Sequence, residues 1–285
     1  MSVLKKMKTF GFIFSKKPAQ AMELLQIRLE RKFGVPLYFL STRRLITRFF
    51  ELMKTAKLSD RFVPYGNYFL EPSLLGKRPV VFSVGVGQDI TFDRALLERH
   101  EVDLHLFDPT PVSQRYIAAQ DLPKNLKFSP FAVTNYDGKV DLYSDDLENN
   151  FEQASSVSIF QRGVHGEKFS AECRTIPSLM KERNISHLDV LKLDIEGAAL
   201  QVLADTLDHG IFPTQIACEF ERPETLKELY VYLKDLAHLF ARLEEAGYAC
   251  FRTREADKGC QIEIVAIRTR TAESPVSDPV AATAG

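Results

Sequence analysis

The feature that most limits the fold is a regular alternation of short apolar runs with amphipathic stretches, which begins near residue 77. Seven runs have the length and the β-branched content of strands. They cover residues 79–85, 103–108, 126–130, 188–194, 214–220, 248–252 and 260–267. Helical periodicity marks residues 92–99, 112–120, 176–182, 198–207 and 225–246. This alternation predicts an α/β fold in which a mostly parallel sheet of seven strands carries helices on both faces.

The last two runs are separated by the turn residues Asp257, Lys258 and Gly259. Such a spacing favours a closing hairpin, and we expect it to add an antiparallel strand at the edge of the sheet.

Composition and cysteine spacing set the broad class of the protein. Its 285 residues are 45% hydrophobic and 26% charged, as is ordinary for a globular chain. No apolar run reaches the roughly 18 residues of a membrane span. The spacing of Cys173, Cys218, Cys250 and Cys260 matches no zinc or disulfide pattern, which indicates reduced thiols and no metal site. The basic start lacks the apolar length of a signal peptide, so we expect a cytoplasmic protein.

Charge is distributed unevenly along the chain. Residues 1–57 contain 13 Lys and Arg but only 3 Asp and Glu, although the whole chain has a net charge of −1. Helical periodicity occurs at 21–33 and again at 42–58, so we expect residues 1–60 to form a basic helical extension. It either caps the main domain, residues 61–269, or contacts an anionic membrane surface or glycan. Residues 270–285 read as a disordered tail, and the balanced charge gives no overall attraction to nucleic acid.

The first candidate site follows the run at 79–85, where Gly85 and Gly87 precede a helical stretch. Glycines at this point allow a tight turn and a close approach to a ligand. Ile90 stands where the dinucleotide pattern G-x-G-x-x-G has its third glycine, which argues against NAD. Asp108 ends the next run, 21 residues after Gly87, and either binds ribose hydroxyls or caps the following helix. Together these residues favour an adenosyl cofactor.

Carboxylates also follow two later runs. Asp194 and Glu196 end the run at 188–194, and Glu219 and Glu221 end the run at 214–220. In an open α/β sheet the ligand crevice lies at the carboxyl ends of the strands, so Asp194 should lie beside the glycines. Both pairs have simpler explanations, as helix caps or as charged residues beyond the sheet. Asp194 or Glu219 is the candidate general base, with His165 and His187 as alternatives.

The motifs in this order resemble those of the FkbM-type methyltransferases. They are VVFSVGVGQDITFD (80–93), LHLFDPTP (104–111), FAVTNYDGKVDLY (131–143), LDVLKLDIEGAALQVL (188–203) and IACEFE (216–221). Enzymes of that family use S-adenosylmethionine on a Rossmann-like class I fold, and many O-methylate sugars or natural products. The resemblance covers roughly residues 60–222 and is strongest at LKLDIEGA (191–198).

The resemblance also implies roles for individual residues. Gly85 and Gly87 would line the methionine part of the cofactor, Asp108 its ribose, and Asp194 the region of the methyl and amino groups. Ser83 stands where the family usually has an acidic residue. The implied cofactor contacts are Ser83, Gly85, Gly87, Gln88, Asp108, Pro109, Phe131, Ala132, Asp137 and Asp194.

The resemblance predicts an S-adenosylmethionine-dependent enzyme that methylates a hydroxyl of a saccharide, glycoconjugate or natural product. Two alternatives remain: a nicotinamide-dependent oxidoreductase, and a non-catalytic module that binds an adenosyl cofactor. The segment Tyr65-Gly-Asn67-Tyr68, just before the first run, is expected to form a wall of the pocket.

Overall fold

The computed structural model describes residues 42–53, 55–123, 126–144, 157–158, 168–221, 226–253 and 262–269. Several expected features lie outside these residues, namely the helix at 21–33, the loop with His165, the hairpin turn at 257–259 and the tail from residue 270. Within the described ranges, no helix combines the length and apolar character needed to cross a membrane.

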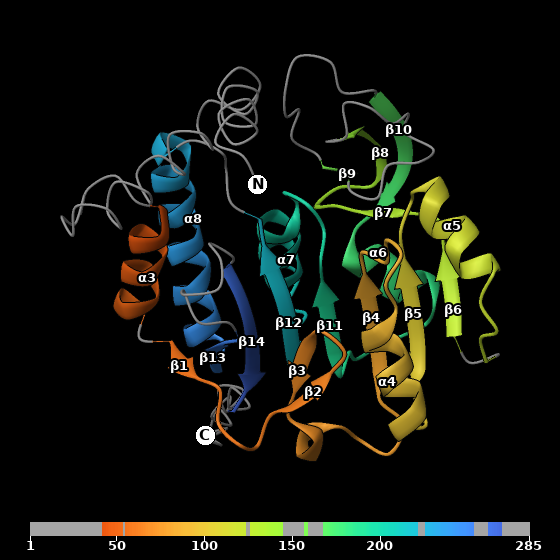
Figure 1. Ribbon diagram of the computed structural model, residues 1–285, viewed down its shortest axis with the longest axis horizontal. Coiled ribbons are helices and arrows are strands. Elements are labelled where there is room, and N and C mark those ends of the chain that lie inside the picture. Colours follow the sequence, from red (N-terminus) through yellow and green to blue (C-terminus); the bar gives the residue numbers. More distant parts are fainter. Residues whose placement is uncertain are drawn as a thin grey trace, which may run out of the picture.

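The centre of the molecule is an eight-stranded sheet (Figure 1). Its order is β1-β13-β14-β12-β11-β4-β5-β6. In chain order these strands are β1 (Ala56–Lys57), β4 (Val80–Val84), β5 (Asp103–Phe107), β6 (Leu126–Ser129), β11 (Val190–Leu193), β12 (Gln215–Phe220), β13 (Tyr248–Arg252) and β14 (Ile262–Arg268). All neighbours pair in parallel except β14, which is antiparallel to β12 and β13. The predicted α/β class with a mostly parallel sheet is confirmed, and each predicted run is a strand.

Two details of the predicted sheet were wrong. The short strand β1 extends the sheet to eight strands, and it lies within residues 42–58, where the periodicity predicts a helix. The antiparallel strand β14 lies inside the sheet, between β12 and β13, and not at its edge. Residues 262–267 of β14 are buried without interruption, which is typical of a central strand with neighbours on both sides.

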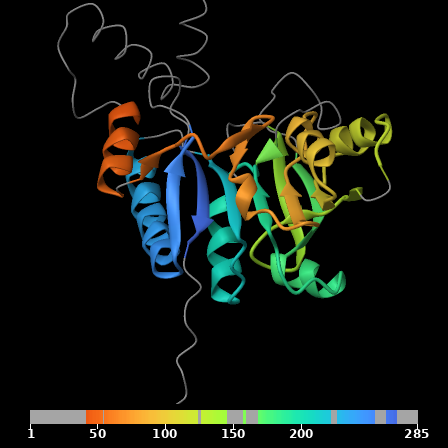
Figure 2. The same cartoon turned by 90° about the horizontal axis from the view of Figure 1, so that it is seen from below.

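Helices cover both faces of the sheet, as predicted (Figure 2). One face carries α6 (Ile176–Glu182), α7 (Ala199–Asp208) and α8 (Leu226–Glu245). The other carries α4 (Thr91–Arg99), α5 (Pro111–Ala118) and a small hairpin of β2 (Val63–Tyr65) and β3 (Tyr68–Leu70). A single turn of 3-10 helix, Pro72–Leu74, follows the hairpin. The first described helix, α3 (Thr42–Leu52), packs on α8, where the ring centres of Phe49 and Phe240 are 5.3 Å apart.

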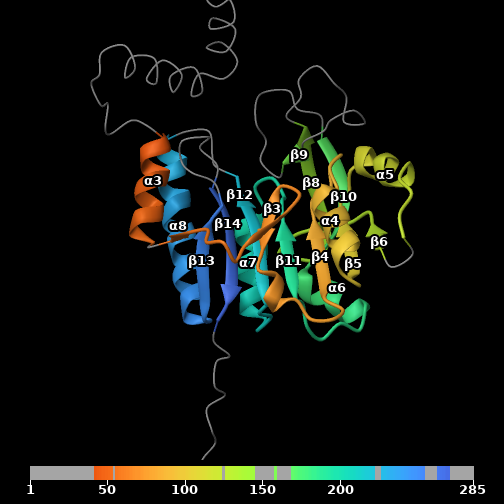
Figure 3. The same ribbon diagram turned by 60° about the horizontal axis from the view of Figure 1, so that its bottom comes forward.

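The hairpin and a second small sheet were not predicted. The hairpin crosses the sheet where β3 packs against β12 and β14 and β2 packs against α4 (Figure 3). The second sheet has the order β7-β10-β8-β9 and stands beyond the carboxyl ends of the central strands (Figure 1). Its strands are β7 (Ala132–Val133), β8 (Gly138–Ser144), β9 (Val157–Ser158) and β10 (Lys168–Arg174). Both additions lie next to the cavity described below.

The alternation of side chains along each central strand divides the core into two apolar clusters. Phe82 and Val84 of β4 face α6, α7 and α8, whereas Val81 faces α4 and the hairpin. Strands that are buried on both faces have near-continuous apolar sequences, as these do. A polar residue inside such a strand therefore needs a partner or a function.

Candidate active site

The glycine turn after β4 brings two distant parts of the chain into contact. Gly85 and Gly87 have φ angles of +86° and +53°, which L side chains rarely adopt. A Cβ atom on Gly85 would lie 1.8 Å from the carbonyl oxygen of Asp194. Because β4 and β11 are parallel neighbours, paired at Val84 and Leu193, their continuations meet at the same edge of the sheet. Gly85 therefore allows the close approach that places Asp194 beside the turn, as expected.

Asp108, at the end of β5, holds the same glycine turn from the other side. It is buried, and its Oδ2 accepts hydrogen bonds from the backbone N–H groups of Val86 and Gly87, each at 2.9 Å. Its Oδ1 accepts from the N–H of Thr110 at 2.8 Å and from the hydroxyl of Thr110 at 2.6 Å. The cap of α5 is Thr110, whose side chain accepts from the N–H of Ser113. Asp108 thus lines the cavity and holds the glycine turn in place through its hydrogen bonds.

A buried lysine that the motif analysis did not single out completes the turn. Lys192 of β11 is 3% exposed, and its ammonium donates a 2.6 Å hydrogen bond to the carbonyl oxygen of Gly85. The same ammonium lies 3.5 Å from Asp194 Oδ2 and 5.2 Å from the ring centre of Tyr68. The signal for Lys192 was a charged residue inside the apolar run at 188–194, since a charge is rarely buried there without a purpose.

The strand position of Lys192 lies directly opposite Ser83 of β4. Ser83 is fully buried and lies beside Asp93, which is buried in the first turn of α4. Burial raises the pKa of Asp93, while the charge of Lys192 and the neighbouring Ser83 hydroxyl oppose this rise. Ser83 and Asp93 therefore lie behind the cavity wall, next to the only described ammonium in that wall.

These residues surround a cavity of about 330 Å³ at the carboxyl ends of β4, β5, β11 and β12. The predicted site residues that line it are Gly85, Gly87, Gln88, Asp108, Pro109, Phe131, Ala132, Asp194 and Glu219. Asn67 and Tyr68 of the hairpin also line it, in agreement with the expected wall. Tyr65 does not, because its hydroxyl bonds to His100 Nε2 at 2.7 Å.

Two predicted cofactor contacts lie away from the cavity lining. Ser83 is buried behind the glycine turn. Asp137 accepts hydrogen bonds from Ser178 and from the N–H of Thr175 at the start of α6. Burial alone would raise the pKa of Asp137, but these hydrogen bonds lower it below its ordinary value. Asp137 therefore acts as a structural acceptor in this structure.

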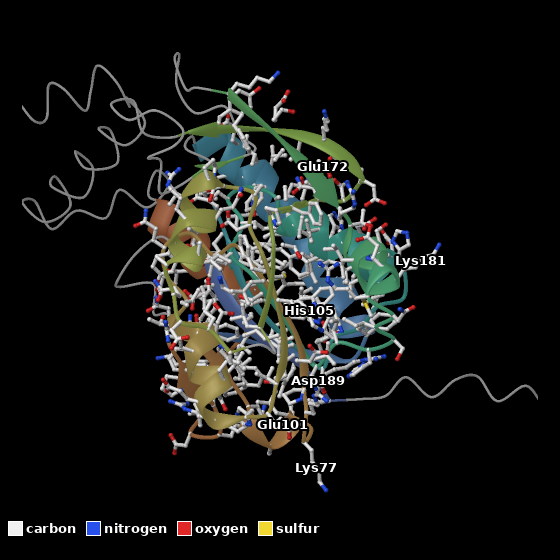
Figure 4. All side chains as sticks on the ribbon, turned by 90° about the vertical axis from the view of Figure 1, so that its right-hand side faces the viewer. Lys77, Glu101, His105, Glu172, Lys181 and Asp189 are labelled. Carbon is white, nitrogen blue, oxygen red and sulfur yellow. The ribbon has the colours of Figure 1, made fainter. Side chains whose placement is uncertain are left out.

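Of the two other candidate bases that the structure describes, one lines the cavity and one lies away from it. Glu219 lines the cavity, and its strand position lies opposite Glu263 of β14. His187 bonds to Thr214 and lies 3.7 Å from Asp189, where β11 is about to begin. Figure 4 places Asp189 with Lys77 and Glu101, at the end of the molecule opposite Glu172 of β10. His187 therefore lies at the amino ends of the strands, away from the cavity.

The electrostatics of the cavity favour a cation. Of its described lining residues, five carry carboxylates and one carries an ammonium. The carboxylates belong to Asp89, Asp108, Asp194, Glu196 and Glu219, and the ammonium to Lys192. At the start of α4, Asp89 accepts hydrogen bonds from the N–H of Thr91 at 2.8 Å and from the amide of Asn67 at 2.7 Å. In dinucleotide-binding folds the first turn of this helix binds a pyrophosphate, whereas here it already binds a carboxylate of the chain.

Comparison with known proteins now adds the family. The methyltransferase FkbM domain matches residues 76–250, which is more than half of the chain. The chain belongs to the FkbM methyltransferase family. The predicted resemblance is thereby confirmed. The FkbM match includes the glycine turn, Asp108, Asp194 and Glu219, but it begins after the hairpin that carries Asn67 and Tyr68.

Solved structures of methyltransferases show a distant likeness. An FkbM methyltransferase from Methylobacillus flagellatus KT is 9% identical with a TM-score of 0.47, over 81% of this chain and 62% of that one. Human N-acetylserotonin methyltransferase, solved with SAM, is 11% identical with a TM-score of 0.31, over 91% and 58%. A precorrin-6y C5,15-methyltransferase from Geobacter metallireducens is also 11% identical with a TM-score of 0.31, over 75% and 92%. The chain thus spans less than two thirds of the length of the Methylobacillus protein. No curated protein matches the chain.

Proposed function

We propose that the chain binds S-adenosylmethionine in the cavity and transfers its methyl group to a hydroxyl of a saccharide, glycoconjugate or natural product. The observation that carries this proposal is a glycine turn in a cavity whose described lining residues carry five carboxylates and one ammonium. S-adenosylmethionine carries a sulfonium and an ammonium against one carboxylate, so its net positive charge suits an excess of carboxylates. In this arrangement Gly85, Gly87 and Gln88 would bind the methionine end, Asp108 and Pro109 the ribose, and Phe131 and Ala132 the adenine.

The same features argue against a nicotinamide dinucleotide. Its pyrophosphate carries two negative charges, which the carboxylates of Asp89, Asp108 and Asp194 would repel. The N–H of Thr91, at the start of α4, is already bonded to Asp89. The third glycine of the dinucleotide pattern is replaced by Ile90, whose side chain is buried in the core. We therefore favour the methyl donor over the oxidoreductase alternative.

When bound, S-adenosylmethionine supplies a methyl group that is already activated on sulfur. The work of the chain is then to align the acceptor, which can be worth about 7–11 kcal/mol, and to accept its proton, which contributes about 10²–10⁴-fold. Asp194 and Glu219 come from neighbouring strands and line the same cavity, so either carboxylate can take the proton of an acceptor hydroxyl. Lys192 keeps Asp194 and the Gly85 carbonyl in place.

A second hollow supports a polar acceptor. It has a volume of about 400 Å³ and shares Thr134 and Ala198 with the first cavity. Its other lining residues mix hydrogen-bond donors and acceptors with two tyrosine rings, namely Asn135, Tyr136, Lys139, Val140, Asp141, Tyr143, Gln201 and Val202. Hydroxyl-rich molecules need such a mixture, because each hydroxyl both donates and accepts.

The cofactor proposal is tested by calorimetric titration of the full chain with S-adenosylmethionine and, separately, with NADH. We expect micromolar binding of S-adenosylmethionine and none of NADH. Asp108→Asn should weaken that binding by more than about tenfold, since an amide N–H group would face the N–H groups of Val86 and Gly87. Asp103→Asn is the matched control, at the amino end of the same strand, where Asp103 pairs with Lys127. Binding of NADH in place of S-adenosylmethionine would overturn the proposal.

The acceptor is tested by incubation with methyl-labelled S-adenosylmethionine and a panel of oligosaccharides and other polyhydroxylated compounds. With an acceptor whose only nucleophiles are hydroxyls, a labelled product that survives mild base is a methyl ether, whereas a methyl ester is released. Tight cofactor binding with no transfer to any compound would favour the alternative of a non-catalytic binding module.

A further inference from the structure

The tip of the hairpin formed by β2 and β3 is fixed beside the cavity. Gly66 has a φ of +57°, and a Cβ atom there would lie 2.5 Å from the backbone nitrogen of Phe92 in the first turn of α4. The next residue, Asn67, donates a 2.7 Å hydrogen bond to Asp89. These contacts hold the hairpin against the helix that begins beside the glycine turn. The position of Tyr68, which follows directly, is thereby set.

Tyr68 is 5% exposed and its ring lies between two groups. The ring of Phe92 meets it edge to face, with centres 5.7 Å apart and planes at 78°. The ammonium of Lys192 lies 5.2 Å from its centre, within the range of a cation–π contact. Tyr68 therefore covers the one ammonium among the described residues of the cavity wall.

Tyr68 lines the cavity together with the carboxylates of Asp194 and Glu219. Burial raises the pKa of Tyr68 well above its ordinary value, and the nearby carboxylate of Asp194 raises the pKa further. Glu219 and Glu263 act in the same direction. A phenol in such surroundings keeps its proton and can only donate it in a hydrogen bond to a carboxylate.

Asp194 is the carboxylate whose orientation such a partner would set. Its side chain is 44% exposed, so the surrounding core does not fix its orientation. Its backbone is held against Gly85, and Lys192 lies 3.5 Å from its Oδ2. Tyr68 lines the same cavity and lies against the same ammonium, so a hydrogen bond from its hydroxyl would select one rotamer of the carboxylate. Tyr68 is placed to do so.

We propose that Tyr68 is a positioning residue of the methyl-transfer site, whose hydroxyl orients Asp194 toward the amino acid end of the methyl donor. The inference rests on the proposed function. It assigns a part of the site to the hairpin, which lies outside the segment shared with the family. Tyr68 acts through Asp194 and Lys192 and takes no proton itself.

The test compares Tyr68→Phe with Tyr65→Phe, which removes a buried hydroxyl from the same hairpin but outside the cavity. Calorimetry is run with S-adenosylmethionine and with 5′-methylthioadenosine, which lacks the amino acid part. We expect Tyr68→Phe to weaken binding of S-adenosylmethionine roughly tenfold, the effect of one hydrogen bond to a charged group, and that of 5′-methylthioadenosine less than about twofold. Tyr65→Phe should change neither. Thermal unfolding of both variants reports any general loss of folding.

A double-mutant cycle with Asp194→Asn tests the route of the effect. If Tyr68 acts through Asp194, Tyr68→Phe should weaken binding of S-adenosylmethionine much less in the Asp194→Asn background. Equal losses of affinity for both ligands would mean that Tyr68 only supports the fold. Unchanged binding of both ligands would mean that Tyr68 has no role. Either result would overturn this inference but leave the proposed function standing. A wild-type chain that binds no S-adenosylmethionine would overturn the proposed function, and this inference with it.

Discussion

Single charged residues set the shape of the glycine turn before any ligand arrives. Asp108 binds the N–H groups of Val86 and Gly87, and Lys192 binds the carbonyl oxygen of Gly85. A carboxylate and an ammonium from strands on either side thus fix the donors and the acceptor of the same turn. Preorganisation of this kind lowers the ordering cost of binding. Because the turn is formed in advance, we expect S-adenosylmethionine to bind it in the absence of an acceptor.

His105 is a buried ionisable side chain whose ring nitrogens make no hydrogen bond, although Nε2 lies 3.4 Å from Asp103 Oδ1. It is 1% exposed in the middle of β5, with its ring centre 5.3 Å from that of Phe82 (Figure 4). Burial, assisted by the positive charges of Lys127 and Arg183 and opposed by Asp103, lowers the pKa of His105 to about 4. His105 is therefore neutral in the folded protein at neutral pH.

The low pKa of His105 predicts a specific pH dependence of stability. In the unfolded chain its pKa is about 6.5, so between about pH 6.5 and 4 the unfolded state binds more protons than the folded state. As the pH is lowered through this window, the free energy of unfolding should therefore fall by up to about 1.4 kcal/mol for each pH unit. We expect His105→Leu to remove roughly 1–2 kcal/mol of the loss between pH 6.5 and 5, measured by urea denaturation. His187→Leu, at an exposed position, is the control, and an identical pH dependence in wild type and His105→Leu would refute the assignment.

At the scale of elements, strand periodicity was informative wherever a run was long and buried on both faces. The central strands and the helices between them were predicted to within a few residues for this reason. The hairpin was missed because β2 and β3 have three residues each, too few for a periodic signal. The small sheet was missed because its strand β7 has two residues and pairs with β10, about 40 positions further along the chain.

The candidate site was predictable to the extent that it follows a rule about strand ends. Gly85, Asp108, Asp194 and Glu219 each come where a buried strand ends, and parallel strands bring those ends together. Tyr68 obeys no such rule, because its place depends on how the hairpin crosses the sheet. Residues of this kind are placed by packing and not by their own neighbours in sequence.

The close approach of β4 and β11 makes a sharp prediction for Gly85→Ala. The added Cβ would meet the Asp194 carbonyl, so the two strand ends must separate or the turn must rearrange. Gly210→Ala is the matched control: Gly210 also has a positive φ, +69°, but no atom lies within 4 Å of the added Cβ. That control should cost about 1 kcal/mol, whereas Gly85→Ala should cost about 2 kcal/mol more and abolish binding of S-adenosylmethionine. Equal stabilities of the two variants, by chemical denaturation, would contradict the steric argument.

At the scale of the whole molecule, the opposite charges of the basic start and the acidic remainder raise the question of what residues 1–57 contact. The structure shows that part of this segment belongs to the core, since Ile46, Phe49 and Phe50 of α3 are buried. Deleting all 57 residues would therefore expose the face of α8 that α3 covers. A test of the basic charge must leave α3 in place.

Neutralising charge upstream of α3 isolates the electrostatic contribution. We predict that the full chain binds vesicles containing phosphatidylserine at low salt, and that changing Lys5, Lys6, Lys8, Lys16 and Lys17 to Gln weakens this binding strongly. Each basic residue near an anionic surface contributes about 1 kcal/mol, and salt screens the contribution. Sedimentation with vesicles at two salt concentrations measures both effects, and phosphatidylcholine vesicles are the control. Binding of S-adenosylmethionine is the control for folding of the variant, and we expect it to stay unchanged. Vesicle binding that is equal in wild type and variant, or absent in both, would leave packing of α3 on α8 as the sole function assigned to the extension.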